Sequence, residues 1–253
     1  MKKIFSIALI SSVFFASCDQ DLEKPADWAS VAIIQASPVA ATNPSDTLHV
    51  FVDGARYNST GILYNSNSTY LPIVAGAKTF DIRRGTASTS SADYSKYVNS
   101  FSYTLEKGGA YSFFVYDTTT GASASDAKVL RLKDDLTLPG NNSKVRFLHL
   151  APKAAAVDVT LLRTSVTPND SVTISGKSYI GGSPNEAGLA PFVSVPRGTY
   201  TAKIKTAGSQ TVLTSATVTL TNGADITQGR IVTIYITGTA KGRPLAIGQF
   251  RHY

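Results

Sequence analysis

The chain of 253 residues contains a single cysteine, Cys18, and this scarcity excludes several kinds of chemistry. One cysteine cannot form a disulfide within the chain, and it cannot supply a cysteine-based metal cage. Each folded unit must therefore be held together by the packing of apolar side chains.

Catalytic and cofactor motifs are also absent from the sequence. The three histidines (His49, His149 and His252) lack the i, i+4 spacing of a helical zinc site. There is no G-x-S-x-G elbow, P-loop or dinucleotide fingerprint. The adjacent Asp134 and Asp135 would point to opposite faces of an extended segment, so we interpret them as a solvated turn. We expect no enzyme activity, no metal and no cofactor, with a hydrolase as a remote alternative.

Charge of one sign and long apolar runs are scarce as well. The net charge of +7 falls by two if residues 1–17 are removed with Lys2 and Lys3. The remaining charge is mild and forms no basic stripe, so we expect no nucleic-acid partner. No segment after residue 17 approaches the roughly 18 apolar residues of a transmembrane helix.

Residues 1–18 hold the clearest signal of location. Two lysines precede an apolar stretch, Ile4–Ala16, that is shorter than the roughly 20 residues needed to span a bilayer. The stretch ends in Phe15-Ala16-Ser17-Cys18. This resembles a bacterial lipoprotein signal, although the consensus usually has Leu at the place of Phe15. The resemblance implies cleavage before Cys18 and acylation of this residue, so that acyl chains anchor the protein to a membrane.

Acidic residues follow the cysteine directly, in Asp19-Gln20-Asp21-Leu22-Glu23-Lys24. In the Bacteroidota such residues resemble a surface-export signal, whereas in enteric bacteria an Asp there favours retention in the inner membrane. The charges can also be incidental to a solvated tether. We expect attachment to the outer membrane at the cell surface, with its periplasmic face as the alternative.

The sequence contains an internal repeat. Val31–Pro38 aligns with Val145–Pro152, and each is an alternating apolar strand that ends at a proline. Further along, Phe101–Leu105 corresponds to Ala216–Leu220. The same order of strand signals at one period predicts two copies of one unit.

Short strand-like runs, separated by Gly, Pro, Asn and Asp, make up each unit. A lasting 3.6-residue apolar period is missing, so the pattern predicts β-sandwiches rather than helices. We predict an all-β chain with a signal peptide (1–17), a lipidated tether (18–28), a first sandwich (29–137), a linker (138–143) and a second sandwich (144–253). We expect the linker to limit swivelling without abolishing it. A single larger barrel is the alternative fold.

The segment Val145–Val159 reads V-R-F-L-H-L-A-P-K-A-A-A-V-D-V. It resembles the opening signature of domain-of-unknown-function family 4397, in which a V-R-hydrophobic-H-A-S-P strand continues into A-P-A-V-D-V. The first copy has Gln35 where the family has His. The resemblance spans nearly all of residues 29–253 and implies two tandem immunoglobulin-like β-sandwich domains on an exported bacterial protein. The family has no established activity, so it implies no catalytic residues.

Several polar and aromatic residues have a predicted role. We expect His149 to bond loop carbonyls and fix the bend at the proline, with Gln35 in the matching place and Asp158 as a partner. We expect Trp28 to plug the base of the first sandwich.

Four tyrosines of the first unit lie in Ser/Asn-rich connections: Tyr57, Tyr64, Tyr94 and Tyr97. Exposed rings there can stack on sugars or contact a protein, or they can lie flat on their own domain. Asp46-Thr47-Leu48 and Asp170-Ser171-Val172 resemble an O-glycosylation sequon, so sugars on Thr47 and Ser171 are a hypothesis.

Two function classes remain open. The first is a surface-displayed, non-catalytic binding or adhesion module with a protein or glycan ligand. The second is an architectural spacer or assembly subunit of an envelope or nutrient-uptake complex, with no small ligand. In both classes the acyl chains on Cys18 attach the protein to the membrane.

Overall fold

The computed structural model describes residues 27–38, 47–85, 95–117, 127–164, 170–222, 225–240 and 242–252. The predicted signal peptide, Cys18 and Tyr94 lie outside these ranges. The described part of the chain is all-β, as predicted, and its one helix is the short α1 (Glu186–Leu189). No helix in the described ranges is long and apolar enough to cross a membrane.

The first sandwich has two sheets. One sheet has the order β11-β10-β1, and β5 and β6 both pair with the other side of β1. In the second sheet, β2 pairs with β7 on one side and with β3 and β4 on the other, and β8 and β9 pair with the far side of β7. β1 pairs in parallel with β10, from Ser30 opposite Ala110 to Gln35 opposite Val115. The strands are β1 (Trp28–Gln35), β2 (Thr47–Val52), β3 (Ala55–Arg56), β4 (Ile62–Leu63), β5 (Ser66–Asn67), β6 (Leu71–Val74), β7 (Gly76–Gly85), β8 (Ser95–Lys96), β9 (Phe101–Leu105), β10 (Ala110–Tyr116) and β11 (Lys128–Asp134).

The second sandwich repeats this plan. Its sheets have the orders β15-β12-β20-β21 and β14-β13-β16-β17, and β18 and β19 form a separate ribbon. Its first strand again pairs in parallel with its next-to-last long strand, from Lys144 opposite Ile231 to His149 opposite Ile236. The strands are β12 (Asn142–His149), β13 (Val157–Arg163), β14 (Asp170–Lys177), β15 (Val193–Pro196), β16 (Thr199–Thr206), β17 (Val212–Thr219), β18 (Thr221–Asn222), β19 (Asp225–Gly229), β20 (Ile231–Thr237) and β21 (Ala246–Arg251).

Two sandwiches of two sheets each confirm the predicted fold class, and the alternative of one larger barrel is wrong. Each sandwich encloses its own apolar core. Val31 and Ile33 of β1 pack with Phe80 and Phe113 in the first core. Val145 of β12 occupies the corresponding place in the second core. Alternation along a strand places these side chains on one face of the sheet.

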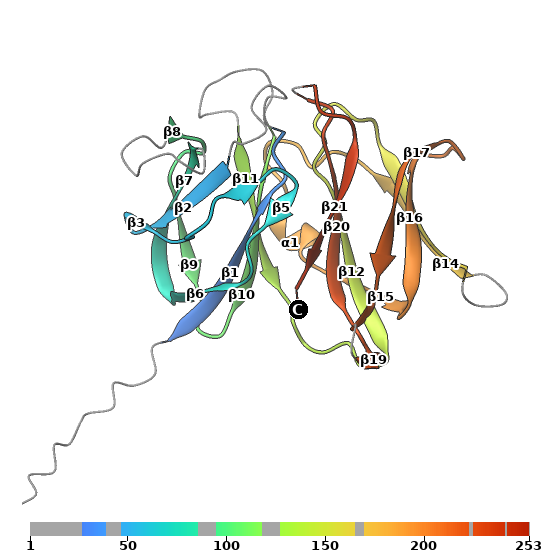
Figure 1. Ribbon diagram of the computed structural model, residues 1–253, viewed down its shortest axis with the longest axis horizontal. Coiled ribbons are helices and arrows are strands. Elements are labelled where there is room, and N and C mark those ends of the chain that lie inside the picture. Colours follow the sequence, from blue (N-terminus) through green and yellow to red (C-terminus); the bar gives the residue numbers. More distant parts are fainter. Residues whose placement is uncertain are drawn as a thin grey trace, which may run out of the picture.

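A third apolar core lies between the sandwiches. Figure 1 shows the sheet of β1, β10 and β11 facing the sheet of β12, β20 and β21. Both faces of the central strands β1, β10, β12 and β20 are buried along most of their length, as in sheets covered on two sides. This core fills the space between the sandwiches, so the swivelling expected from the linker would have to expose apolar side chains. The third core contains Ala32, Ile34, Ala36, Phe114, Tyr116, Leu130, Leu132, Leu148, Leu150, Tyr235 and Phe250.

Candidate functional site

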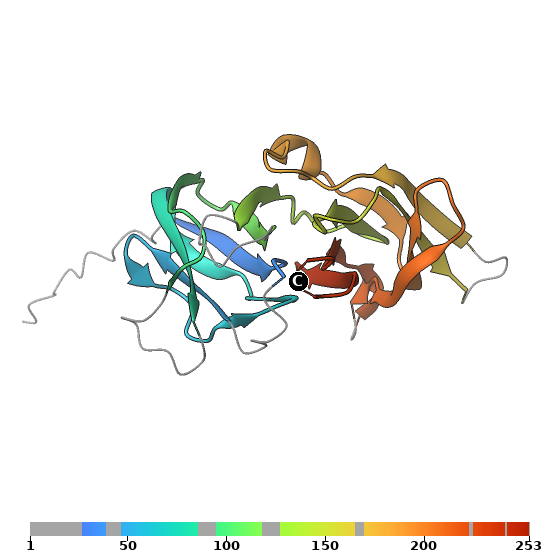
Figure 2. The same cartoon turned by 90° about the horizontal axis from the view of Figure 1, so that it is seen from above.

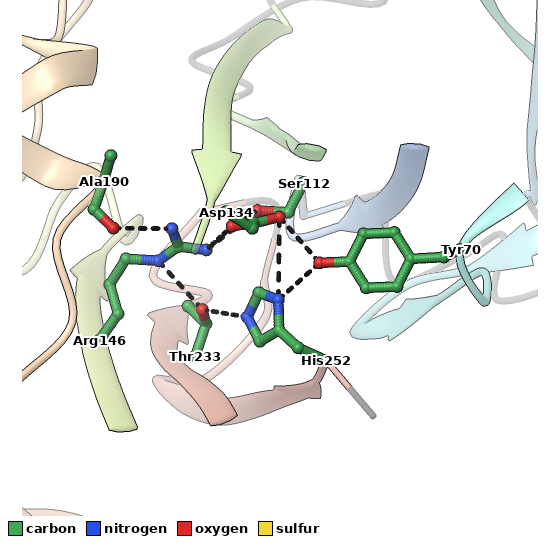
Figure 3. A network of polar contacts seen from close by, with 7 residues as sticks. All are labelled: Tyr70, Ser112, Asp134, Arg146, Ala190, Thr233 and His252. Atoms are coloured by element: carbon green, nitrogen blue, oxygen red, sulfur yellow. Dashed lines mark hydrogen bonds and ion pairs between the residues drawn. The ribbon is translucent and has the colours of Figure 1, made fainter. Parts of the chain in front are cut away.

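A cluster of polar side chains interrupts the central core near the connection between the sandwiches (Figure 3). Three members come from the first sandwich and three from the second. The facing sheets supply most of them, and Tyr70 directly precedes β6. We call this cluster the interdomain clamp, and it consists of Tyr70, Ser112, Asp134, Arg146, Thr233 and His252.

A buried ion pair forms the centre of the clamp. Arg146 Nη2 lies 2.9 Å from Asp134 Oδ1, and the two side chains are 2% and 0% exposed. Arg146 also donates through Nε to Thr233 Oγ1 at 3.0 Å and through Nη1 to the carbonyl of Ala190 at 3.1 Å. The ring of Phe192 covers the guanidinium at 4.5 Å. Since a buried charge is costly without partners, these contacts make the two sandwiches depend on each other.

The remaining contacts close a ring of hydrogen bonds. Tyr70 Oη donates to Asp134 Oδ2 at 2.8 Å, so it accepts from His252 Nδ1, 2.6 Å away. Thr233 Oγ1 accepts from Arg146 and therefore donates to His252 Nε2 at 2.9 Å. This network assigns a neutral His252 with its proton on Nδ1.

The ionisation of the clamp agrees with this assignment. Burial, and next the charge of Arg146, lower the pKa of His252 to about 2. Burial raises the pKa of the Asp134 carboxyl, while Arg146 and the hydrogen bonds oppose that effect. Burial, and next the nearby Asp134, raise the pKa of the Tyr70 hydroxyl, which keeps it a donor. The clamp groups satisfy one another, so we interpret the cluster as a structural device that holds the sandwiches together.

The surface of the molecule is hollowed where β11 meets the segment around α1, which lie beside each other in Figure 2. We call this hollow the junction groove. It has a volume of about 490 Å³, and a neighbouring hollow of about 310 Å³ extends it towards Asn99 and Phe101. The two sandwiches both contribute to the groove, through Tyr116, Lys128, Val129, Arg131, Gly182, Ser183, Pro184, Asn185 and Glu186.

Contacts between the sandwiches hold the groove in shape. Arg131 Nε donates to Glu186 Oε1 at 2.8 Å, and Tyr116 Oη donates to the carbonyl of Gly181 at 3.0 Å. Asn185 caps α1, since its Oδ1 accepts from the Gly188 amide at 3.1 Å. Lys128 pairs with Asp117, so both cations of the groove have a carboxylate partner. The groove is therefore polar but carries little net charge.

Comparisons with known proteins identify a family. The model of a domain of unknown function (DUF4397) matches residues 19–160, more than half of the chain. The chain belongs to this family. The DUF4397 match takes in the first sandwich, β12 and the start of β13, so it ends well before residue 253, which the sequence resemblance had included. A search of curated proteins finds no match.

Two solved structures are similar to parts of this DUF4397 protein. A leucine-rich repeat protein from Bacteroides thetaiotaomicron shares 14% identity over 76% of this chain, with a TM-score of 0.26. This chain spans 24% of the length of that protein. A protein from Bacteroides fragilis, described as a candidate cell adhesion protein, shares 10% identity over 90% of this chain and 98% of its own, with a TM-score of 0.24.

The described tyrosines of the predicted contact set do not gather on one exposed surface. Tyr97 is 6% exposed and its Oη lies 2.7 Å from Ser37 Oγ, so the expectation of an exposed ring is wrong there. Tyr57 packs against the first core. Tyr64 contacts the second sandwich, because its Oη lies 3.4 Å from Thr237 Oγ1.

The two predicted glycosylation sites have different surroundings. Thr47 is 5% exposed, and its hydroxyl donates to the carbonyl of Gly85 at 3.0 Å. A buried hydroxyl in that position has no room for a sugar, so the hypothesis of glycosylation at Thr47 is wrong. Ser171 is exposed on β14, and its modification stays a prediction.

The predicted corner residues are confirmed in part. His149 Nε2 lies 3.0 Å from the carbonyl of Ala155, so the histidine does fix the bend. Gln35 bonds the bend of the first copy through Oε1, which accepts from the Ser37 amide at 3.1 Å. The role expected for Asp158 is wrong, because its carboxylate accepts from the amides of Gly176 and Gly208 and caps two turns instead.

The structure differs from the sequence-based predictions for Trp28 and for the pair Asp134 and Asp135. Trp28 is 48% exposed, so it does not plug the base of the sandwich. Asp134 is buried against Arg146, and of the predicted solvated pair Asp135 alone is exposed, in an ion pair with Lys144. Sequence reasoning missed the clamp, because Asp134 and Arg146 lie in strands that also contain charged residues outside the core, such as Lys133.

Proposed function

We propose that this protein is a lipid-anchored, non-catalytic binding or adhesion module on the surface of a bacterial outer membrane. The observation that carries the binding role is the junction groove, which has walls from both sandwiches. Ligand sites occur preferentially where domains meet. The location rests on the predicted acylation of Cys18 and on the acidic residues that follow it.

The chemistry of the groove favours an uncharged, polar ligand. Arg131 and Lys128 already have carboxylate partners, so a strongly charged ligand would have to displace Glu186 or Asp117. Hydroxyl and amide groups at Ser183 and Asn185 can bond sugar hydroxyls or peptide groups, and Phe101 adds a partly exposed ring. We therefore infer a glycan or an extended protein segment as the ligand.

Photo-crosslinking in living cells tests the binding role. A photoreactive amino acid at Asn185, in the groove, is compared with one at Ser215, which is exposed on the outer sheet of the second sandwich. We expect a crosslinked product from position 185 that position 215 does not give. Equal products from both positions, or none from either, contradict a ligand in the groove.

Two measurements test the anchor and the membrane face. Metabolic labelling with a clickable palmitate should mark the protein and should fail for the Cys18→Ala variant. Protease treatment should remove the protein from intact cells. Removal from lysed cells alone contradicts the cell-surface location and favours the periplasmic face.

The central core favours a second candidate function, an architectural spacer. A stack of four sheets with three cores holds its two ends at a fixed distance. A spacer predicts no crosslinked product at the groove. It also predicts an envelope defect in cells that lack the protein, and the Arg146→Ala variant, which loosens the stack, should reproduce that defect.

A further inference from the structure

Three large apolar side chains are exposed at one end of the molecule: Trp28, Val74 and Leu138, at 48%, 43% and 65%. Trp28 and Val74 are direct partners across β1 and β6, so they share one face. Leu138 lies in the connection from β11 to β12, which runs along the same lower end of Figure 1 as the start of β1. We call this end the base.

The base is well ordered by hydrogen bonds, so these side chains are not exposed by fraying. The carbonyl of Trp28 accepts from the Gly108 amide at 2.8 Å, and the carbonyl of Asp27 accepts from the Ala75 amide at 2.6 Å. Arg230 and Arg251 add positive charge beside the β11–β12 connection, whereas the lysines nearby are paired with carboxylates. These pairs are Lys107 with Asp27, Lys133 with Glu106, and Lys144 with Asp135.

The chain leading to the base is short. Trp28 follows Cys18 by ten residues, and even a fully extended chain of that length reaches about 35 Å. An acylated Cys18 therefore keeps the base close to the bilayer. Tryptophan suits this place, because its apolar ring and polar N–H favour the boundary between lipid and water.

We propose that the base docks on the lipid surface, with Trp28, Val74 and Leu138 in the boundary between headgroups and acyl chains. The proposal rests on the proposed acylation of Cys18. Docking depends on burial of these apolar side chains, and Arg230 and Arg251 would add attraction to an anionic surface without being required for it. β1 then rises away from the membrane, and the two sandwiches stand side by side above it (Figure 1).

Trp28 is the one tryptophan of the chain, so its fluorescence reports on the base without engineering. The acylated full-length protein is reconstituted in phosphatidylcholine vesicles, with and without brominated phosphatidylcholine. We expect the emission of Trp28 to shift to shorter wavelength on reconstitution and to be quenched by the brominated lipid. Both effects should appear in vesicles without anionic phosphatidylglycerol, because the apolar side chains carry the docking.

The matched control moves the reporter to the opposite end. Leu63 is 50% exposed and pairs with Thr47, which lies opposite Gly85 at the far end of β7. In the Trp28→Phe, Leu63→Trp variant the emission should stay unquenched. A second variant, Val74→Asp with Leu138→Asp, keeps Trp28 and should lose the shift and the quenching while its circular dichroism stays the same.

The outcomes separate the docking from the anchor. A protein that does not associate with vesicles contradicts both. A protein that associates but leaves Trp28 unquenched contradicts the docking alone, as does equal quenching at position 63. A shift that appears without lipid and grows with protein concentration also overturns the proposal, because a second copy then covers the base.

Discussion

The first strands of the two sandwiches, β1 and β12, occupy equivalent places but differ where the sandwiches meet. Ala32 of β1 lies opposite Ser112, and Arg146 of β12 lies opposite Thr233, so Ala32 and Arg146 hold the same position. Leu132 and Phe250, on the last strand of each sandwich, lie opposite Ser112 and Thr233 respectively. Asp134 and His252 follow Leu132 and Phe250 by two positions, so they are equivalent as well.

The comparison of β1 with β12 shows how two copies of one unit can pack against each other within a single chain. Two identical faces would place like charges against each other across the central core, which is unfavourable when the charges are buried. Here the equivalent positions differ: Arg146 of the second copy matches the uncharged Ala32, and Asp134 of the first copy matches the neutral His252. The small Ala32 carries no charge that would compete for that carboxylate. Each face therefore fits the other better than it fits itself.

The largest expected effect comes from breaking the ion pair on one side. Arg146→Ala leaves Asp134 buried without its charge partner, and we expect a loss of about 3–5 kcal/mol in the free energy of unfolding. Urea denaturation measures this loss.

The double variant Arg146→Met, Asp134→Leu should recover most of the loss. Lys133→Ala, which removes an exposed pair next to Asp134, should cost below about 1 kcal/mol. Equal losses for Arg146 and Lys133 contradict the clamp.

A second way to disturb the facing sheets is to overfill them. Gly248 lies opposite Tyr235 on β20, and an added Cβ would collide with the Tyr235 ring and with Asn65 of the first sandwich. We expect Gly248→Ala to cost up to about 3 kcal/mol, as overpacked cores do. Calorimetry measures the change. An unchanged melting temperature would mean that the sandwiches do not meet at this strand.

The buried, neutral His252 predicts that the stability of the folded protein depends on pH. The pKa of His252 is about 2 in the folded protein and 6.5 in the unfolded chain. Its contribution to stability is therefore complete above pH 6.5 and is lost as the pH falls towards 2. We expect a loss of about 2 kcal/mol at pH 5 that the His252→Gln variant lacks. Identical pH profiles of the two proteins contradict a neutral buried His252.

The smallest expected effect concerns the corner residues, His149 and its counterpart Gln35. His149→Ala removes the bond to the Ala155 carbonyl, and we expect a loss of about 1 kcal/mol. His149→Gln installs the residue of the first copy, whose amide can donate the same bond, and should lose less. Denaturation in parallel measures both. A larger loss for Gln than for Ala contradicts the shared role.

Much of the fold was predictable from the sequence, because alternation along Val145–His149 and the proline that follows it have local causes. The arrangement of the sandwiches was not predicted. Its signal was present, since β10 and β20 are apolar without alternation and so require cover on both faces. The clamp depends on contacts between residues far apart in the chain, and side chains such as Tyr97 are buried by tertiary packing that periodicity does not encode.

The central claim is that the third core and the clamp make the two sandwiches one rigid body. Spin labels on Ser102→Cys and Ser215→Cys, in a Cys18→Ala background, report the distance between the outer sheets. Both positions are exposed, on β9 and β17. We predict a single narrow distance distribution that broadens when Arg146→Ala is added. A broad distribution before that substitution contradicts the claim, because it shows sandwiches that move independently.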